Sequence, residues 1–159
     1  MNTNNIDILF VEDNQYEAKL AIHNLKKYNL TDHLLHLNDG ELAVDYLFGT
    51  GTYTGRDMSH KPKVILLDIN LPKVSGMEIL HMVKSDQRTS SIPVVILTAS
   101  GESEDIKTGY ALGANSYLVK PVDFESFSRT VSGLGIYWTT INQATSFIQD
   151  TLWMSITDR

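Results

Sequence analysis

The sequence contains no cysteine and no long hydrophobic run. Without cysteine the chain forms neither disulfides nor a thiolate metal site, and this composition fits a reducing cytosol. No apolar run approaches the roughly 20 residues that span a bilayer. Residues 1–5 lack the basic region and apolar stretch of a signal peptide. We therefore expect a cytoplasmic protein without a membrane span.

Basic residues are too few and too scattered to form a patch that binds nucleic acid. The chain has 13 Lys and Arg against 19 Asp and Glu, which gives a net charge of −6 at pH 7. Only Lys26 and Lys27 are adjacent. Because a nucleic-acid-binding surface usually carries a basic stripe, we expect no direct contact with DNA or RNA.

Short apolar runs recur along the 159 residues. Residues 6–11 form a β-like run rich in branched residues, and two more, 64–67 and 94–97, are continuous rather than alternating. Continuous runs of this length are typical of strands buried on both faces. Residues 34–37 and 117–119 are weaker candidates for strands. The length and the hydrophobic content of 42% suit one domain with one core.

Helical patterns separate these runs. Ser75 and Glu78 have the spacing of a capping box, Ser103 is followed by two acids, and Asp123 is a candidate cap. We expect the helix that starts near Ser103 to end at Gly113. The apolar positions of each helical face are Ala18, Ala21, Ile22 and Leu25; Ala43, Tyr46 and Leu47; Ile79, Leu80 and Val83; and Phe127, Val131 and Leu134.

Five repeats of strand and helix predict an α/β fold, a doubly wound five-stranded parallel sheet with right-handed crossovers. Residues 49–62 are long for a connection between a helix and a strand, and we expect a surface insertion there. In doubly wound sheets, ligands bind beyond the carboxyl ends of the strands. The chemistry should therefore be carried by residues that follow the apolar runs.

Charged and hydroxyl side chains stand at those positions. Glu12 and Asp13 follow the first run, Asp68 the third, Thr98 the fourth and Lys120 the fifth. Three carboxylates in one pocket repel each other unless a cation intervenes, and an oxygen-only ligand set favours Mg²⁺. An Asp carboxylate can also attack phosphorus, and a metal, an ammonium and a hydroxyl suit a transferring phosphoryl group.

The chain resembles the receiver domains of response regulators, whose smallest familiar example is the chemotaxis receiver. The matching segments are residues 8–14 (ILFVEDN), 64–72 (VILLDINLP) with Gly76, 94–99 (VVILTA) and 113–121 (GANSYLVKP). Each segment alone is weak evidence for this family, but all of them in this order, on an alternation of strands and helices, indicate it strongly. The resemblance covers residues 5–135, implies the flavodoxin-like (βα)5 receiver fold, and leaves residues 136–159 as a C-terminal extension.

The resemblance also implies roles for single residues. Asp68 would be the phosphoacceptor, and Lys120 would pair with the phosphoryl group. Thr98 would move to hydrogen-bond that group, and Tyr117 would swing inward with it. The Lys120–Pro121 bond would be cis, as is usual in the family.

The same resemblance implies a Mg²⁺ site, a donor and a target. Asp13 would bind the metal directly, Glu12 through water, and Asn70 through its backbone carbonyl, while Asn70 and Ser100 would tune hydrolysis of the acyl phosphate. A sensor histidine kinase or a phosphotransfer protein would supply the phosphoryl group. The face around Tyr117, with Ile106 and Tyr110, would signal to a protein partner.

Two departures from the smallest receivers narrow the resemblance. One is the insertion at 49–62. The other is that the sequence stops soon after the fifth helix, which leaves no room for a DNA-binding domain. With these two features the chain resembles the single-domain receivers that work with phytochrome-type histidine kinases. Some of those dimerise through their C-terminal part, so the segment from Tyr137 onward is a candidate for packing against a second copy. It could equally fold back on its own domain or, from residue 143, be partly disordered.

Two other functions would need residues that this sequence does not have at the required positions. A haloacid-dehalogenase phosphatase would need a second acid two residues after Asp68, where Asn70 stands. A flavodoxin-like cofactor binder would need a phosphate-binding loop where Glu12 and Asp13 lie. His33 and His36 have a spacing that suits a metal on a helix but should face opposite sides of a strand. An isolated Asp ending a strand would be merely structural, and Asp68 gains its functional interpretation only from the set around it.

Overall fold

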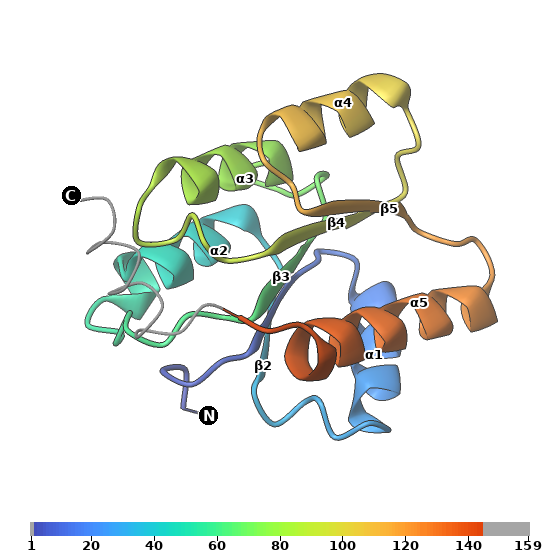
Figure 1. The fold of residues 1–159 in the computed structure, drawn as a ribbon, viewed down its shortest axis with the longest axis horizontal. Coiled ribbons are helices and arrows are strands. Elements are labelled where there is room, and N and C mark those ends of the chain that lie inside the picture. Colours follow the sequence, from blue (N-terminus) through green and yellow to red (C-terminus); the bar gives the residue numbers. More distant parts are fainter. Residues whose placement is uncertain (1, 145–159) are drawn as a thin grey trace.

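The structure is a computed structural model that describes residues 2–144, in which five strands alternate with five α-helices (Figure 1). The strands are β1 (Ile8–Val11), β2 (Leu34–Leu37), β3 (Val64–Leu67), β4 (Val94–Thr98) and β5 (Ser116–Val119). The helices are α1 (Gln15–Lys26), α2 (Gly40–Phe48), α3 (Gly76–Ser85), α4 (Ser103–Ala111) and α5 (Phe124–Ile136). A short 3-10 helix covers Gly51–Tyr53, and a π-helical turn covers Tyr137–Ile141.

All strand pairs are parallel, and the strand order is β2-β1-β3-β4-β5. Helices α1 and α5 cover one face of the sheet, while α2, α3 and α4 lie on the other (Figure 1). Alternate residues of each central strand enter different cores, since Ile8 and Phe10 pack on the α1/α5 side and Leu9 and Val11 on the α2/α3 side. The predicted doubly wound fold is confirmed.

Side-chain caps fix where most helices begin. Asn14, Asp39 and Asp123 each accept a backbone N–H three residues on, and Ser75 and Glu78 form the predicted capping box. The prediction that Ser103 caps α4 was wrong. That helix begins one residue earlier than expected, because its cap residue is Glu102, whose N–H is taken by the Ser100 hydroxyl.

The insertion at 49–62 lies at the surface and packs on the end of α2. The Arg56 guanidinium donates to the Tyr46 carbonyl at 2.7 Å and stands 4.1 Å from the centroid of the Tyr46 ring. The segment therefore satisfies carbonyls that the helix end would otherwise leave to water.

Two further expectations concern the C-terminal half. No peptide bond is cis within residues 2–144, so the expected cis Lys120–Pro121 bond is corrected to trans, the isomer that prolyl bonds favour by about 0.5–1 kcal/mol. No helix in the same range is long and apolar enough to cross a bilayer. Self-association through the segment from Tyr137 onward stays a prediction, since most of that segment lies outside the described residues.

The start of α3 packs directly on the backbone of the third strand's end. A Cβ added at Gly76 would lie 2.2 Å from the Asp68 carbonyl oxygen and 2.5 Å from the Ile69 Cα. We expect Gly76→Ala to lower the free energy of unfolding by about 1–3 kcal/mol, because backbone on both sides must shift. Urea denaturation measures this change.

The matched control is Gly133→Ala in α5, where an added Cβ meets no atom within 4 Å. That substitution should raise stability by up to about 1 kcal/mol, because Ala favours a helix interior over Gly. Equal effects of the two substitutions would show that the α3 contact is not tight.

Candidate functional site

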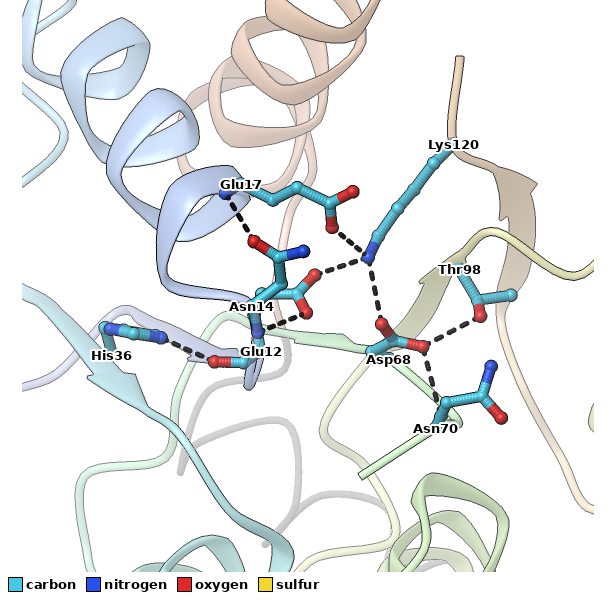
Figure 2. Close-up of polar contacts among 8 residues, drawn as sticks. All are labelled: Glu12, Asn14, Glu17, His36, Asp68, Asn70, Thr98 and Lys120. Atoms are coloured by element: carbon cyan, nitrogen blue, oxygen red, sulfur yellow. Dashed lines mark hydrogen bonds and ion pairs between the residues drawn. The ribbon is translucent and has the colours of Figure 1, made fainter. Parts of the chain in front are cut away.

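The candidate site lies at the carboxyl edge of the sheet, where four strands bring their polar ends together (Figure 2). Glu12 follows β1, Asp68 follows β3, Thr98 ends β4 and Lys120 follows β5. Glu12, Asp68 and Thr98 are buried, although two of them carry ionisable groups. The parallel sheet thus gathers side chains that are far apart in sequence, as the position of each after its strand predicts.

The Lys120 ammonium is the centre of the site. Its Nζ lies 2.6 Å from Glu12 Oε1, 2.6 Å from Glu17 Oε2 and 2.9 Å from Asp68 Oδ2. The side chains of Lys120, Glu12 and Asp68 are less than a tenth exposed, whereas that of Glu17 is 33% exposed. One buried cation therefore balances a group of anions that would otherwise repel each other.

Burial and ion pairing shift two pKa values in this group. Burial raises the pKa of Glu12 to about 7, against the opposing pull of the Lys120 ammonium. Burial alone would lower the pKa of Lys120, but its hydrogen bonds to Glu12, Glu17 and Asp68 outweigh burial and raise it. Lys120 is accordingly charged at neutral pH, and a cation beside Glu12 would favour the ionised form of that carboxyl.

The second oxygen of Asp68 is held by neutral donors. Thr98 Oγ1 donates to Asp68 Oδ1 at 2.8 Å, and the Asn70 backbone N–H donates to the same oxygen at 3.1 Å. The Thr98 hydroxyl thus already reaches the Asp68 carboxylate in this structure. The carboxylate is oriented by contacts from its own loop, from the end of β4 and from the residue after β5, which suits a group that must present an oxygen to an incoming reactant.

Asp13 completes an acidic cluster with Glu12 and Asp68. One carboxylate oxygen from each residue lies within 4.8 Å of the other two, and Asp13 is exposed while its partners are buried. Oxygen ligands open to solvent on one side fit a hard dication that keeps several waters. The residues present therefore fit Mg²⁺. A role for the Asn70 carbonyl as a further ligand stays a prediction.

Tyr117 lies beside this site without entering the acidic cluster. Its hydroxyl donates to the Ser100 carbonyl at 2.8 Å, and a Cβ added at Gly109 of α4 would lie 3.1 Å from the Tyr117 ring. The Ser100 hydroxyl in turn donates to Asp105 at 2.5 Å. Tyr117 therefore links β5 to α4 and to the loop that follows Thr98.

Two contacts were missed by reasoning from the sequence. The sequence pattern assigns Glu17 no role, yet its side chain reaches Lys120 because the Asn14 cap starts α1 right beside Glu12 and Asp13. His36 lies within hydrogen-bond distance of the Glu12 carbonyl, at 2.8 Å, whereas His33 lies near the Asn5 carbonyl. The two histidines thus contact different parts of the backbone, and His33 lies just before β2 and not within it.

Mg²⁺ should raise the stability of the chain, and Asp13→Asn should remove most of this gain. At a hundredfold excess over its dissociation constant, a ligand adds about 2.7 kcal/mol to the free energy of unfolding. Asp13 is the exposed acid of the cluster and has no contact with Lys120, so its loss weakens the metal site without breaking the buried ion pairs. Urea denaturation with Mg²⁺ and with EDTA measures the difference.

The control for this experiment is Asp86→Asn, at the end of α3 and so at the opposite edge of the sheet. It should keep the full response to Mg²⁺. A response that Asp13→Asn and Asp86→Asn retain equally would place the Mg²⁺ effect outside the acidic cluster.

Comparison with known proteins gives a consistent picture. The family model described as the response regulator receiver domain matches residues 8–132. Over 131 residues, covering 82% of the chain, identity is 40% to the probable methanogenesis regulatory protein FilR2 of Methanothrix harundinacea and 36% to response regulator Rcp1 of Synechocystis. The match covers 82% and 87% of those relatives.

Two solved structures are similar over nearly their whole length. The Mn²⁺-bound form of Rcp1 has a TM-score of 0.80 at 33% identity, covering 87% of this chain and 98% of that chain. The phosphorylated cyanobacterial phytochrome response regulator RcpA has a TM-score of 0.80 at 32% identity, covering 89% of this chain and 99% of that chain.

Proposed function

The chain belongs to the response regulator receiver family, and we propose that it accepts a phosphoryl group onto Asp68 from a sensor histidine kinase or a phosphotransfer protein. The observation that carries this proposal is the environment of the Asp68 carboxylate. One oxygen faces the Lys120 ammonium, the other faces the Thr98 hydroxyl, and two further acids lie beside it. This combination suits attack on phosphorus followed by neutralisation of the phosphoryl oxygens.

The transfer is a displacement at phosphorus. A carboxylate oxygen of Asp68 forms the new bond to phosphorus, and the bond from phosphorus to the donor's imidazole nitrogen breaks, so that an acyl phosphate and a neutral histidine result. Lys120 and Thr98 would each face a phosphoryl oxygen. Mg²⁺, when bound, would neutralise charge on the phosphoryl group. Glu12, Asp13, Asp68 and the Asn70 carbonyl would hold that ion.

The chain would act as a phosphoacceptor in signalling and not as an enzyme with a separate substrate, although it assists its own phosphorylation and dephosphorylation. Thr98 and Tyr117 would respond to the added charge, and the link from Tyr117 to α4 supports this role. Tyr110 on α4 is half exposed and belongs to the surface that would change. A protein partner would read that surface, since only different contacts in the two states can shift an equilibrium.

Intact-mass spectrometry tests the proposal. The chain is incubated with acetyl phosphate in Mg²⁺ or in EDTA, and the product is then treated with hydroxylamine, which cleaves acyl phosphates. We expect one added phosphoryl group, formed only with Mg²⁺ and removed by hydroxylamine. An adduct that survives hydroxylamine would contradict an aspartyl phosphate, and absence of any adduct even from a donor kinase would reject the function.

A further inference from the structure

Lys120 has an acceptor outside the acidic cluster. Glu12 and Asp68 both belong to the metal-binding set, but the third acceptor, Glu17, comes from the first turn of α1 and lies outside it. The 2.6 Å distance between Lys120 Nζ and Glu17 Oε2 is as short as that to Glu12. Short, charge-assisted hydrogen bonds of this kind are the strong ones.

The hydrogen-bond capacity of an ammonium decides what happens to these contacts. Lys120 has three N–H donors, and each faces a carboxylate in this structure. A metal ion in the acidic cluster would compete with Lys120 for Glu12, and phosphorylation would convert the Asp68 carboxylate into an acyl phosphate, a mixed anhydride with less negative charge on the aspartyl oxygens. Both changes release donors of Lys120 for the phosphoryl oxygens. Glu17 takes part in neither change and can keep its hydrogen bond throughout.

We infer that Glu17 is a positioning residue that holds the Lys120 ammonium at the phosphorylation site once the metal and the phosphoryl group have withdrawn its other two acceptors. This inference rests on the proposed phosphoacceptor function. A lysine side chain loses up to about 2 kcal/mol of rotamer entropy when it is ordered, so an anchor that has already ordered it makes the phosphoryl contact more favourable.

The start of α1 is built to keep this anchor in place. The Asn14 side chain accepts the Glu17 backbone N–H at 3.1 Å, which fixes the first turn of the helix next to Glu12 and Asp13. From this turn the Glu17 side chain points toward the ammonium of Lys120, the residue that follows β5 (Figure 2). The contact therefore depends on tertiary packing, because it joins residues 103 positions apart.

The test compares Glu17→Ala with Glu17→Gln, whose amide oxygen can still accept from Lys120. The control is Glu41→Ala, which removes another first-turn acid, at the start of α2, and so reproduces the lost interaction with a helix dipole. Two quantities are measured with Mg²⁺ present: the affinity for beryllofluoride, an analogue of the phosphoryl group, and the NMR signal of the Lys120 ammonium, assigned with Lys120→Arg.

We expect Glu17→Ala to bind beryllofluoride roughly tenfold more weakly, because the ammonium is no longer held in place, and to lose the slowly exchanging Lys120 signal. Glu17→Gln should keep most of the beryllofluoride affinity and of the Lys120 signal, and Glu41→Ala should change neither the affinity nor the signal. The inference is overturned if Glu17→Ala binds as well as or better than the native chain, since Glu17 would then be irrelevant or a competitor. It also fails if Glu17→Gln is as weak as Glu17→Ala, since charge alone would then matter.

The two readouts separate this inference from the function on which it rests. If the native chain did not bind beryllofluoride or accept a phosphoryl group, the proposed function would fail. The Lys120 signal in Mg²⁺ alone would still decide whether Glu17 holds the ammonium. A signal retained in Glu17→Ala under that condition would overturn the anchor by itself.

Discussion

Asp68→Asn is expected to abolish the phosphoryl adduct and to leave the fold intact. An amide is too poor a nucleophile to attack phosphorus, so no acyl phosphate can form at this position. The amide oxygen can still accept from Thr98 and from the Asn70 N–H, which hold Asp68 in the native chain. The substitution also removes the ion pair with Lys120, but that ammonium keeps Glu12 and Glu17 as acceptors, and repulsion between Asp68 and Glu12 is relieved, so stability in EDTA should stay close to that of the native chain.

Intact-mass spectrometry after incubation with acetyl phosphate and Mg²⁺ measures the adduct, and urea denaturation checks the fold. Asp86→Asn serves as the control, because it makes the same chemical change on a residue that follows α3. It should accept one phosphoryl group as the native chain does. An adduct of unchanged yield on Asp68→Asn would move the phosphoacceptor to another residue, with Asp13 the first to examine.

Much of the fold could be predicted because the strongest signals in the sequence are local. Residues 64–67 and 94–97 form continuous apolar runs, and both become central strands that are fully buried. The weaker run at 117–119 becomes β5, which lies at the edge of the sheet and is only partly buried. Edge strands need fewer apolar residues, so their sequence signal is fainter.

The candidate site could be predicted only in part, for a physical reason. Glu12 and Asp68 follow strands and Thr98 ends one, and parallel strands bring the residues at their carboxyl ends to one edge of the sheet. Glu17 gave no such signal, because an acid in a first helical turn is expected from the helix dipole alone. Its contact with Lys120 depends on how α1 packs against α5, the helix that follows Lys120 in the chain, and no local pattern records that packing.

Lys120→Met should destabilise the chain by about 3 kcal/mol or more in EDTA. Removing one partner of a buried ion pair costs about 3–5 kcal/mol, and Lys120 balances both Glu12 and Asp68 inside the protein. Glu17 is partly exposed, so water can solvate its carboxylate once Lys120 is gone. We therefore expect the loss of unfolding free energy to lie at the lower end of this range. Saturating Mg²⁺ should recover a large part of the loss, because a dication in the acidic cluster replaces the missing positive charge.

The pH dependence of this loss follows from Glu12. Its pKa in the folded chain is already raised to about 7, and removal of Lys120 raises it further, because the ion pair that opposes burial is gone. A carboxyl with a raised pKa in the folded state adds stability below its unfolded pKa of about 4.3 and loses it as pH rises through the folded value. The destabilisation in EDTA should therefore be greater at pH 8 than at pH 5.5.

Lys84→Met is the matched control for this prediction. The Lys84 ammonium also reaches three acceptors, but all are neutral: the carbonyls of Ser90 and Ile92 and the side-chain oxygen of Asn115. Lys84→Met should lower the free energy of unfolding by less than Lys120→Met does, and by the same amount with and without Mg²⁺. Urea denaturation of both variants in Mg²⁺ and in EDTA makes the comparison.

If Mg²⁺ restored the stability of both variants equally, or of neither variant, the ion would not be acting through the negative charge of Glu12 and Asp68. Restored stability in Lys120→Met alone would show that the metal and the ammonium act on the same carboxylates, as the proposed chemistry requires.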